Sequence, residues 1–177
     1  MNIPNLITMM RLVLVPAVIV MISQERWGTA FVLFAVAGIS DAADGLIARR
    51  FDMRTEFGAY IDPLADKALL VSIYVTLSVI GVLPAWLAVM VVSRDLMIVA
   101  AILISRLMDR PVAIKPLFVS KLNTAAQIAF AGIVLAMHAF AISPGPVQAW
   151  GMVVVAALTA VSAAAYLGRW LRHMAGA

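Results

Sequence analysis

Long apolar stretches separated by short polar breaks make up most of this 177-residue chain. Each stretch is close to the roughly 20 residues that an α-helix needs to cross the hydrocarbon core of a bilayer. Apolar residues form 64% of the sequence and its mean hydropathy is +1.05, whereas soluble domains are about 45–50% apolar. The pattern predicts one all-α integral membrane domain over 1–177, with six transmembrane helices at 4–23, 27–50, 59–82, 84–107, 116–139 and 146–171.

Basic residues are distributed unevenly between the two ends of these helices. The breaks after the first, third and fifth predicted helices hold one basic residue, Arg26. Lys and Arg are enriched in cytoplasmic loops, so the other breaks and both termini are expected in the cytoplasm. The apolar run after Arg11 has no signal-peptide cleavage site, and we expect a directly inserted, multi-pass protein of a bacterial inner membrane. The basic residues of the cytoplasmic breaks and tail are Arg50, Arg54, Arg110, Lys115 and Arg172.

Six of the nine acidic residues fall between Asp41 and Asp66, at the predicted cytoplasmic end of the second and third helices. Carboxylates near lipid are costly and usually functional. Asp41 and Asp44 are three residues apart and Asp62 and Asp66 four apart, so each pair shares one face of its helix. Oxygen ligands suit Mg²⁺ or Mn²⁺ better than zinc, and the chain has no Cys and two His. We therefore expect two such ions, bound by these four aspartates.

Three further residues beside the aspartates suit a phosphate ligand. Gly45 and Gly58 remove side chains and let a ligand approach the backbone, and the Arg49 guanidinium matches the geometry of a phosphate. Asp52 and Glu56 are interpreted as ordinary interfacial charges. A different class of function, a small divalent-cation transporter, also places carboxylates in a membrane. A transport pathway would spread them through the bilayer depth, whereas here they gather at one end.

The string Asp41-x-x-Asp44-Gly45-x-x-Ala48-Arg49, eight residues, then Gly58-x-x-x-Asp62-x-x-x-Asp66 resembles the complete signature of the CDP-alcohol phosphatidyltransferases. The opening segment Asn2–Arg11 is similar to that family's first helix. The resemblance implies a six-helix membrane fold, usually dimeric, with a two-metal site that faces the cytoplasm. Members transfer a phosphatidyl group from a CDP-linked lipid to an alcohol and release CMP.

The resemblance also implies individual roles. Asp41, Asp44, Asp62 and Asp66 would bind the two metal ions, and Asp66 would be the general base for the attacking hydroxyl. Residues of the first helix and of the signature would contact the CDP-lipid: Pro4, Asn5, Leu6, Ile7, Gly45, Arg49, Thr55 and Gly58.

The acceptor alcohol is expected to contact residues outside the signature. Arg94 lies within the apolar run 84–107, where a buried Arg needs a partner. That partner is either a carboxylate, Asp95 or Asp66, in a structural pair, or the phosphate of the acceptor. Lys115, Lys121 and Asn123 lie at the start of the next helix and complete the candidate acceptor site. Phosphatidylglycerol and glycerol 3-phosphate, both anionic and hydroxylated, fit such a site, and charge alone does not separate them.

Local sequence similarity favours phosphatidylglycerol as the acceptor. Residues 93–101 and 115–127 resemble the cardiolipin synthases within the family. Phosphatidylglycerophosphate synthases, the alternative, tend to have Arg-Glu and Gly-Lys-x-Lys-Thr at these places, and this chain has neither. The expected reaction therefore joins the phosphatidyl group of CDP-diacylglycerol to the terminal hydroxyl of phosphatidylglycerol.

The last predicted helix is rich in Ala, Gly and Ser between Ala156 and Gly168. Small residues allow close helix approach in membranes, either within the bundle or across the interface of a homodimer. No basic run or aromatic-interleaved patch indicates binding of nucleic acid.

Overall fold

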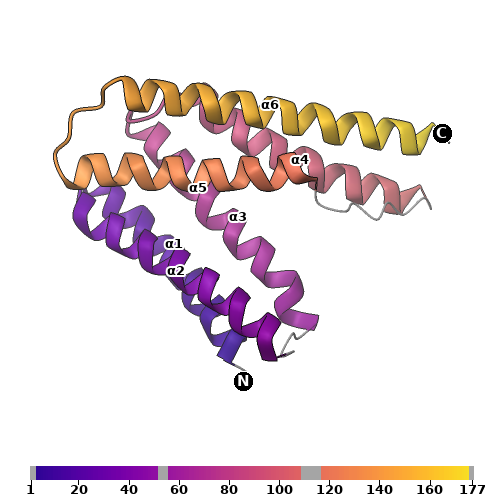
Figure 1. Ribbon diagram of the computed structural model, residues 1–177, viewed down its shortest axis with the longest axis horizontal. Helices are drawn as coiled ribbons and strands as arrows, with labels where there is room; N and C mark the ends of the chain where they lie inside the picture. The colour runs from indigo at the N-terminus through magenta and orange to yellow at the C-terminus, as the bar shows by residue number, and fades with distance from the viewer. Residues whose placement is uncertain (1–2, 52–55, 109–116, 176–177) are drawn as a thin grey trace. The chain divides into compact units, whose positions relative to one another are not determined.

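The computed structural model describes the backbone of residues 3–51, 56–108 and 117–175, and the side chains of residues 10, 13–40, 67–105, 107–108 and 117–175. Within these ranges the regular structure is entirely α-helical (Figure 1). The six predicted helices are confirmed, with every end within three residues of its predicted position. They are α1 (Ile3–Ser23), α2 (Trp27–Phe51), α3 (Glu56–Val79), α4 (Ala85–Leu107), α5 (Phe118–Ala139) and α6 (Pro146–Met174).

The turn after α3 explains why that helix ends three residues earlier than predicted. Gly81 has φ of +80°, in the left-handed region that favours glycine. Its N–H donates to Ser78 O at 3.1 Å, and the N–H of Val82 donates to Leu77 O at 2.9 Å. These two bonds form a Schellman motif, which satisfies the last carbonyls of the helix and stops it.

The first compact unit contains α1, α2, α3 and the end of α5, residues 131–139. Helix α1 packs against both α2 and α3. The end of α5 contacts the start of α2 through aromatic pairs, with 4.4 Å between the ring centroids of Trp27 and His138. Gly132 contributes to this packing, because a Cβ there would lie 3.2 Å from the Phe34 ring. The unit thus provides a packed base for α2 and α3, which hold the aspartates.

The second compact unit contains α4, residues 118–130 of α5, and α6. Helices α4 and α6 pack together, and a hydrogen bond of 2.9 Å from Trp170 Nε1 to Ser105 Oγ joins them. Four buried residues, Val155, Thr159, Ser162 and Tyr166, recur every three or four positions along α6. This spacing places them on one helix face, and three of the four are polar.

Three helices within the described side-chain ranges are long and apolar enough to cross a membrane: Ala85–Ser105, Phe118–Ala139 and Pro146–Met174. The described apolar parts of the other three helices are shorter: Val13–Ser23, Trp27–Ser40 and Lys67–Val79. Large apolar side chains are exposed along the helices, including Val89, Leu103 and Val153. In a bilayer such side chains face lipid. The chain therefore has membrane character, and six complete spans remain a prediction.

Candidate functional site

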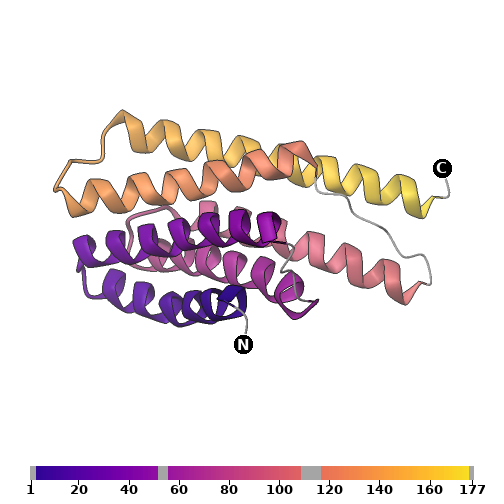
Figure 2. The same ribbon diagram turned by 60° about the horizontal axis from the view of Figure 1, so that its bottom comes forward.

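The four aspartates lie on the halves of α2 and α3 that a short connection joins, in the first unit. Five peptide steps separate Phe51, the end of α2, from Glu56, the start of α3. A chain of that length spans at most about 18 Å. The two helices run in opposite directions (Figures 1 and 2). The aspartate positions therefore lie toward the connected end of both helices.

Counted along each helix from the connected ends, the backbone positions fall at two levels. Asp44 lies seven residues before the end of α2 and Asp62 six residues after the start of α3, which is about 10.5 Å and about 9 Å along the respective helix. Asp41 and Asp66 each lie ten residues from the same ends, or about 15 Å. Each level thus receives one aspartate from each helix, an arrangement that the spacing within either helix does not reveal alone.

The side chains of all predicted metal and CDP-lipid ligands lie outside the described side-chain ranges. Among the side chains that the structure describes, no group of three or more His, Cys, Asp or Glu is placed to hold a metal. The predicted site residues whose side chains are not described are Pro4, Asn5, Leu6, Ile7, Asp41, Asp44, Gly45, Arg49, Thr55, Gly58, Asp62, Asp66 and Lys115.

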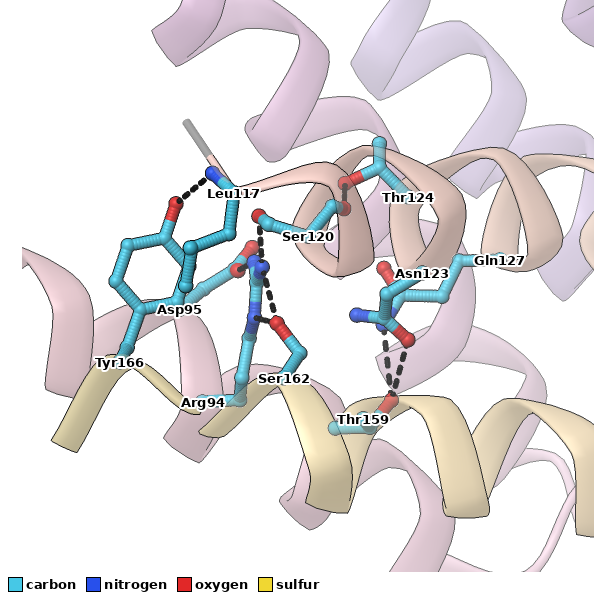
Figure 3. A network of polar contacts seen from close by, with 10 residues as sticks. All are labelled: Arg94, Asp95, Leu117, Ser120, Asn123, Thr124, Gln127, Thr159, Ser162 and Tyr166. Carbon is cyan, nitrogen blue, oxygen red and sulfur yellow. Dashed lines mark hydrogen bonds and ion pairs between the residues drawn. The ribbon is translucent and has the colours of Figure 1, made fainter. Parts of the chain in front are cut away.

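The second unit holds a buried cation with several polar partners, which we call the Arg94 cluster: Arg94, Asp95, Ser120, Ser162 and Tyr166 (Figure 3). Arg94 is 4% exposed. Its Nη1 lies 2.5 Å from Asp95 Oδ1, and its Nη2 donates to Ser162 Oγ at 2.8 Å and also to Ser120 Oγ. The guanidinium carbon lies 5.7 Å from the centroid of the Tyr166 ring. The structural pair with Asp95, one of the two partners predicted from sequence, is formed.

Tyr166 connects the Arg94 cluster to the beginning of α5. Its hydroxyl accepts a hydrogen bond of 3.4 Å from the N–H of Leu117, the residue before the helix. The first N–H groups of a helix have no partner within it, so this contact satisfies one of them. The cluster thereby joins α4, α5 and α6 at the start of α5, close to Lys121, which is exposed.

A second polar group, the amide cluster, consists of Asn123 and Gln127 of α5 and Thr159 of α6 (Figure 3). The Thr159 hydroxyl donates to Asn123 Oδ1 at 3.0 Å and accepts from Gln127 Nε2 at 3.2 Å. The exposed fractions of Asn123, Gln127 and Thr159 are 0%, 2% and 2%. The Nδ2 atom of Asn123 is buried and has no hydrogen-bond partner among the residues that the structure describes.

The structure brings together two of the predicted acceptor residues, Arg94 and Asn123, in the polar part of the second unit. Sequence reasoning did not assign functions to Gln127, Thr159 and Tyr166. One signal was available: polar residues recur at 120, 123 and 127 in one helix and at 159, 162 and 166 in another. Such spacing within apolar helices predicts two polar faces, although not that they meet.

Comparison with known proteins gives a consistent result. The chain matches the CDP-alcohol phosphatidyltransferase family model over residues 1–162. It is 36% identical to human cardiolipin synthase (CMP-forming) over 155 residues, covering 78% of this chain and 52% of the human protein. It is 35% identical to a probable phosphatidylglycerophosphate synthase of Mycobacterium tuberculosis over 186 residues, covering 99% of this chain and 84% of that protein.

A third relative is the CDP-diacylglycerol--glycerol-3-phosphate 3-phosphatidyltransferase of Bacillus subtilis, 32% identical over 142 residues and 72% of each chain. The chain spans about half the length of the human and rat cardiolipin synthases that it matches. The curated relatives therefore include two acceptor specificities at nearly the same identity.

Proposed function

The chain belongs to the CDP-alcohol phosphatidyltransferase family, whose members are enzymes, and we propose that it is a cardiolipin synthase. It would transfer the phosphatidyl group of CDP-diacylglycerol to phosphatidylglycerol and release CMP. The observation that carries the transferase reaction is the family match over residues 1–162, a range that includes the aspartate signature. Because this family consists of enzymes, its match favours a transferase over the cation transporter that the sequence left as an alternative.

The donor set suits two hard divalent cations. Carboxylate oxygens are the ligands that Mg²⁺ and Mn²⁺ favour, and α2 and α3 supply two of them at each of two levels. We propose that Asp41, Asp44, Asp62 and Asp66 hold two such ions. When bound, the ions would offset the negative charge of the pyrophosphate and of the departing CMP.

The protein's own groups would then orient the reactants and move one proton. The terminal hydroxyl oxygen of the acceptor forms a bond to the phosphatidyl phosphorus as the bond from that phosphorus to the CMP oxygen breaks. Asp66 accepts the hydroxyl proton. Arg49 binds phosphate oxygens, whereas Gly45, Thr55, Gly58 and the 4–7 segment contact the CDP-lipid.

The second unit contains candidate acceptor residues that suit either alcohol. Arg94 already has an anionic partner in Asp95, and the amide cluster is uncharged, so Lys115 and Lys121 would supply the charge that balances the acceptor's phosphate. The choice of phosphatidylglycerol rests on the similarity of residues 93–101 and 115–127 to cardiolipin synthases. We propose that Arg94, Lys115, Lys121 and Asn123 form the acceptor site. The human and rat cardiolipin synthases and a probable cardiolipin synthase of Drosophila melanogaster are 35–36% identical to this chain.

Phosphatidylglycerophosphate synthase is the second candidate, because the Mycobacterium relative with that name aligns over 99% of this chain. Both candidates share the metal site and the donor lipid, and they differ only in the acceptor. In either case we propose a bacterial inner-membrane homodimer, with cytoplasmic termini and an active site facing the cytoplasm.

An acceptor competition tests the proposal. The purified protein, in detergent with Mg²⁺ or Mn²⁺, receives CDP-diacylglycerol plus either phosphatidylglycerol or glycerol 3-phosphate, and the lipid product is identified by mass. We expect cardiolipin from the first mixture alone. Phosphatidylglycerophosphate from the second alone would support the second candidate, and an absence of CMP from both would contradict the proposed activity.

A further inference from the structure

The amide cluster contains a hydrogen-bond donor that the described side chains leave unused. Asn123 is 0% exposed, and its Nδ2 has no partner in the described part of the chain. Leaving a buried donor unsatisfied costs about 1–3 kcal/mol. Most buried polar groups are paired, so an exception of this kind calls for an explanation such as a ligand.

The neighbours of Asn123 fix the direction of its free donor. The Thr159 hydroxyl donates to Asn123 Oδ1 at 3.0 Å and accepts a hydrogen bond from Gln127 Nε2 at 3.2 Å. With its carbonyl held in this way, the amide presents Nδ2 on the opposite side. Figure 3 shows Nδ2 directed away from Thr159, toward the side on which Ser120 and Ser162 lie.

The chemistry of this place favours a small, uncharged ligand group. Asn123, Gln127 and Thr159 carry no charge, and the buried cation of the same unit, Arg94, has its own anion in Asp95. A phosphate moved to the buried Nδ2 of Asn123 would lose its hydration, whereas Lys121 of the same helix has an exposed side chain. A hydroxyl both accepts and donates, so it could accept from Nδ2 and donate to a serine oxygen.

We propose that Asn123 Nδ2 donates a hydrogen bond to the secondary, non-reacting hydroxyl of the acceptor's glycerol group. This rests on the proposed function, and it holds for phosphatidylglycerol and for glycerol 3-phosphate alike, because both carry that hydroxyl. Asn123 is then a specificity-determining residue that recognises glycerol, and Thr159 and Gln127 are positioning residues that orient its amide.

The test compares acceptors that differ by this one hydroxyl. Phosphatidylglycerol is compared with phosphatidyl-1,3-propanediol, which keeps the terminal hydroxyl and lacks the secondary one, and kcat/KM is measured for both. We expect the wild type to prefer phosphatidylglycerol by about tenfold, the value of a good buried hydrogen bond. In Asn123→Leu the two acceptors should be used equally, with the KM for CDP-diacylglycerol unchanged.

Two further variants keep the test decisive. Thr159→Val retains both amides and removes the hydroxyl that orients Asn123, so it should also reduce the preference; it decides alone if Asn123→Leu does not fold. Gln148→Leu removes another buried amide from α6, eleven residues before Thr159 and about 16 Å along the helix. That control should keep the wild-type preference.

The other outcomes of the acceptor comparison distinguish a failure of the Asn123 proposal from a failure of the proposed function. Equal use of both lipids by the wild type, or an unchanged preference in Asn123→Leu, overturns the role of Asn123 and leaves the proposed function intact. If the wild type accepts only glycerol 3-phosphate, the proposed acceptor is wrong, and glycerol 3-phosphate against 3-hydroxypropyl phosphate tests Asn123 in the same way. No turnover with any of the four acceptors overturns both proposals.

Discussion

Arg94 and Asp95 are consecutive residues of α4, and their side chains form an ion pair of 2.5 Å in which Arg94 is 4% and Asp95 15% exposed. Consecutive residues on a helix do not face each other. The guanidinium therefore reaches its neighbour's carboxylate from a different face, and Ser162 and Ser120 take its other N–H groups. One arginine thus has partners on all three helices of the second unit.

Removing Arg94 alone should be more damaging than removing the whole ion pair. Arg94→Ala removes the guanidinium from the partly buried Asp95 carboxylate and from the hydroxyls of Ser120 and Ser162, and breaking a buried ion pair costs about 3–5 kcal/mol. We expect the double variant Arg94→Met/Asp95→Leu to recover much of this loss, because it removes both charges of the pair. Thermal unfolding of the purified variants in detergent measures the difference.

The same double variant separates structure from acceptor binding. If Arg94 also binds the acceptor, Arg94→Met/Asp95→Leu will unfold at nearly the wild-type temperature while its acceptor KM is raised more than its KM for CDP-diacylglycerol. Recovery of wild-type kinetics together with stability would assign Arg94 a purely structural role. Asp95→Asn is the matched control, since it keeps the hydrogen-bonding shape and removes only the negative charge.

Asp66→Asn should remove turnover and keep binding of the donor lipid. The amide is nearly the same size as the carboxylate but cannot accept the hydroxyl proton at neutral pH. We expect CMP release to fall by at least about 10²-fold, the lower end of what a general base contributes. Asp52→Asn, a charge removed from the same acidic stretch, should retain activity. Wild-type rates in Asp66→Asn would show that another group is the base.

Chelation should stop the reaction and leave the helices folded. The four aspartates require a divalent ion to offset their mutual repulsion and to hold the pyrophosphate. We expect excess EDTA to abolish CMP release and either Mg²⁺ or Mn²⁺ to restore it, with an unchanged helical circular dichroism spectrum throughout. Full activity in EDTA would contradict the two-metal proposal.

Much of the helical framework could be predicted because the apolar stretches have lengths close to the bilayer thickness, which leaves few alternatives. The end of α3 could not be predicted from hydropathy, because the apolar stretch continues past Val79. The helix stops there because of the turn at Gly81, whose φ is positive. The pairing of Asn123 with Thr159 was also hidden, because it joins residues 36 positions apart. Sequence spacing shows which face of a helix is polar and does not show which face it meets.

The close approach of α6 to α5 gives a prediction about packing. A Cβ on Gly151 would lie 2.4 Å from two ring atoms of Phe130, a side chain that is 3% exposed. Overpacking of this kind costs about 1–3 kcal/mol, so Gly151→Ala should lower the unfolding temperature. A Cβ on Gly168 in the same helix meets no neighbouring atom of the described residues within 4 Å. Gly168→Ala should therefore raise stability by about 0.5–1 kcal/mol, because Ala is the better helix former.

Adding Phe130→Leu to Gly151→Ala shows whether the ring is the cause. Leu lacks the ring atoms that a Cβ at 151 would meet, so the double variant should be less destabilised than the sum of the two single variants. The difference is the coupling energy between the two positions, for which contacting residues typically give about 0.5–3 kcal/mol. Strict additivity in a thermal-unfolding cycle would mean that the loss in Gly151→Ala arises elsewhere along α6. Coupling would show that the Phe130 ring limits the space beside Gly151, where α6 packs against α5.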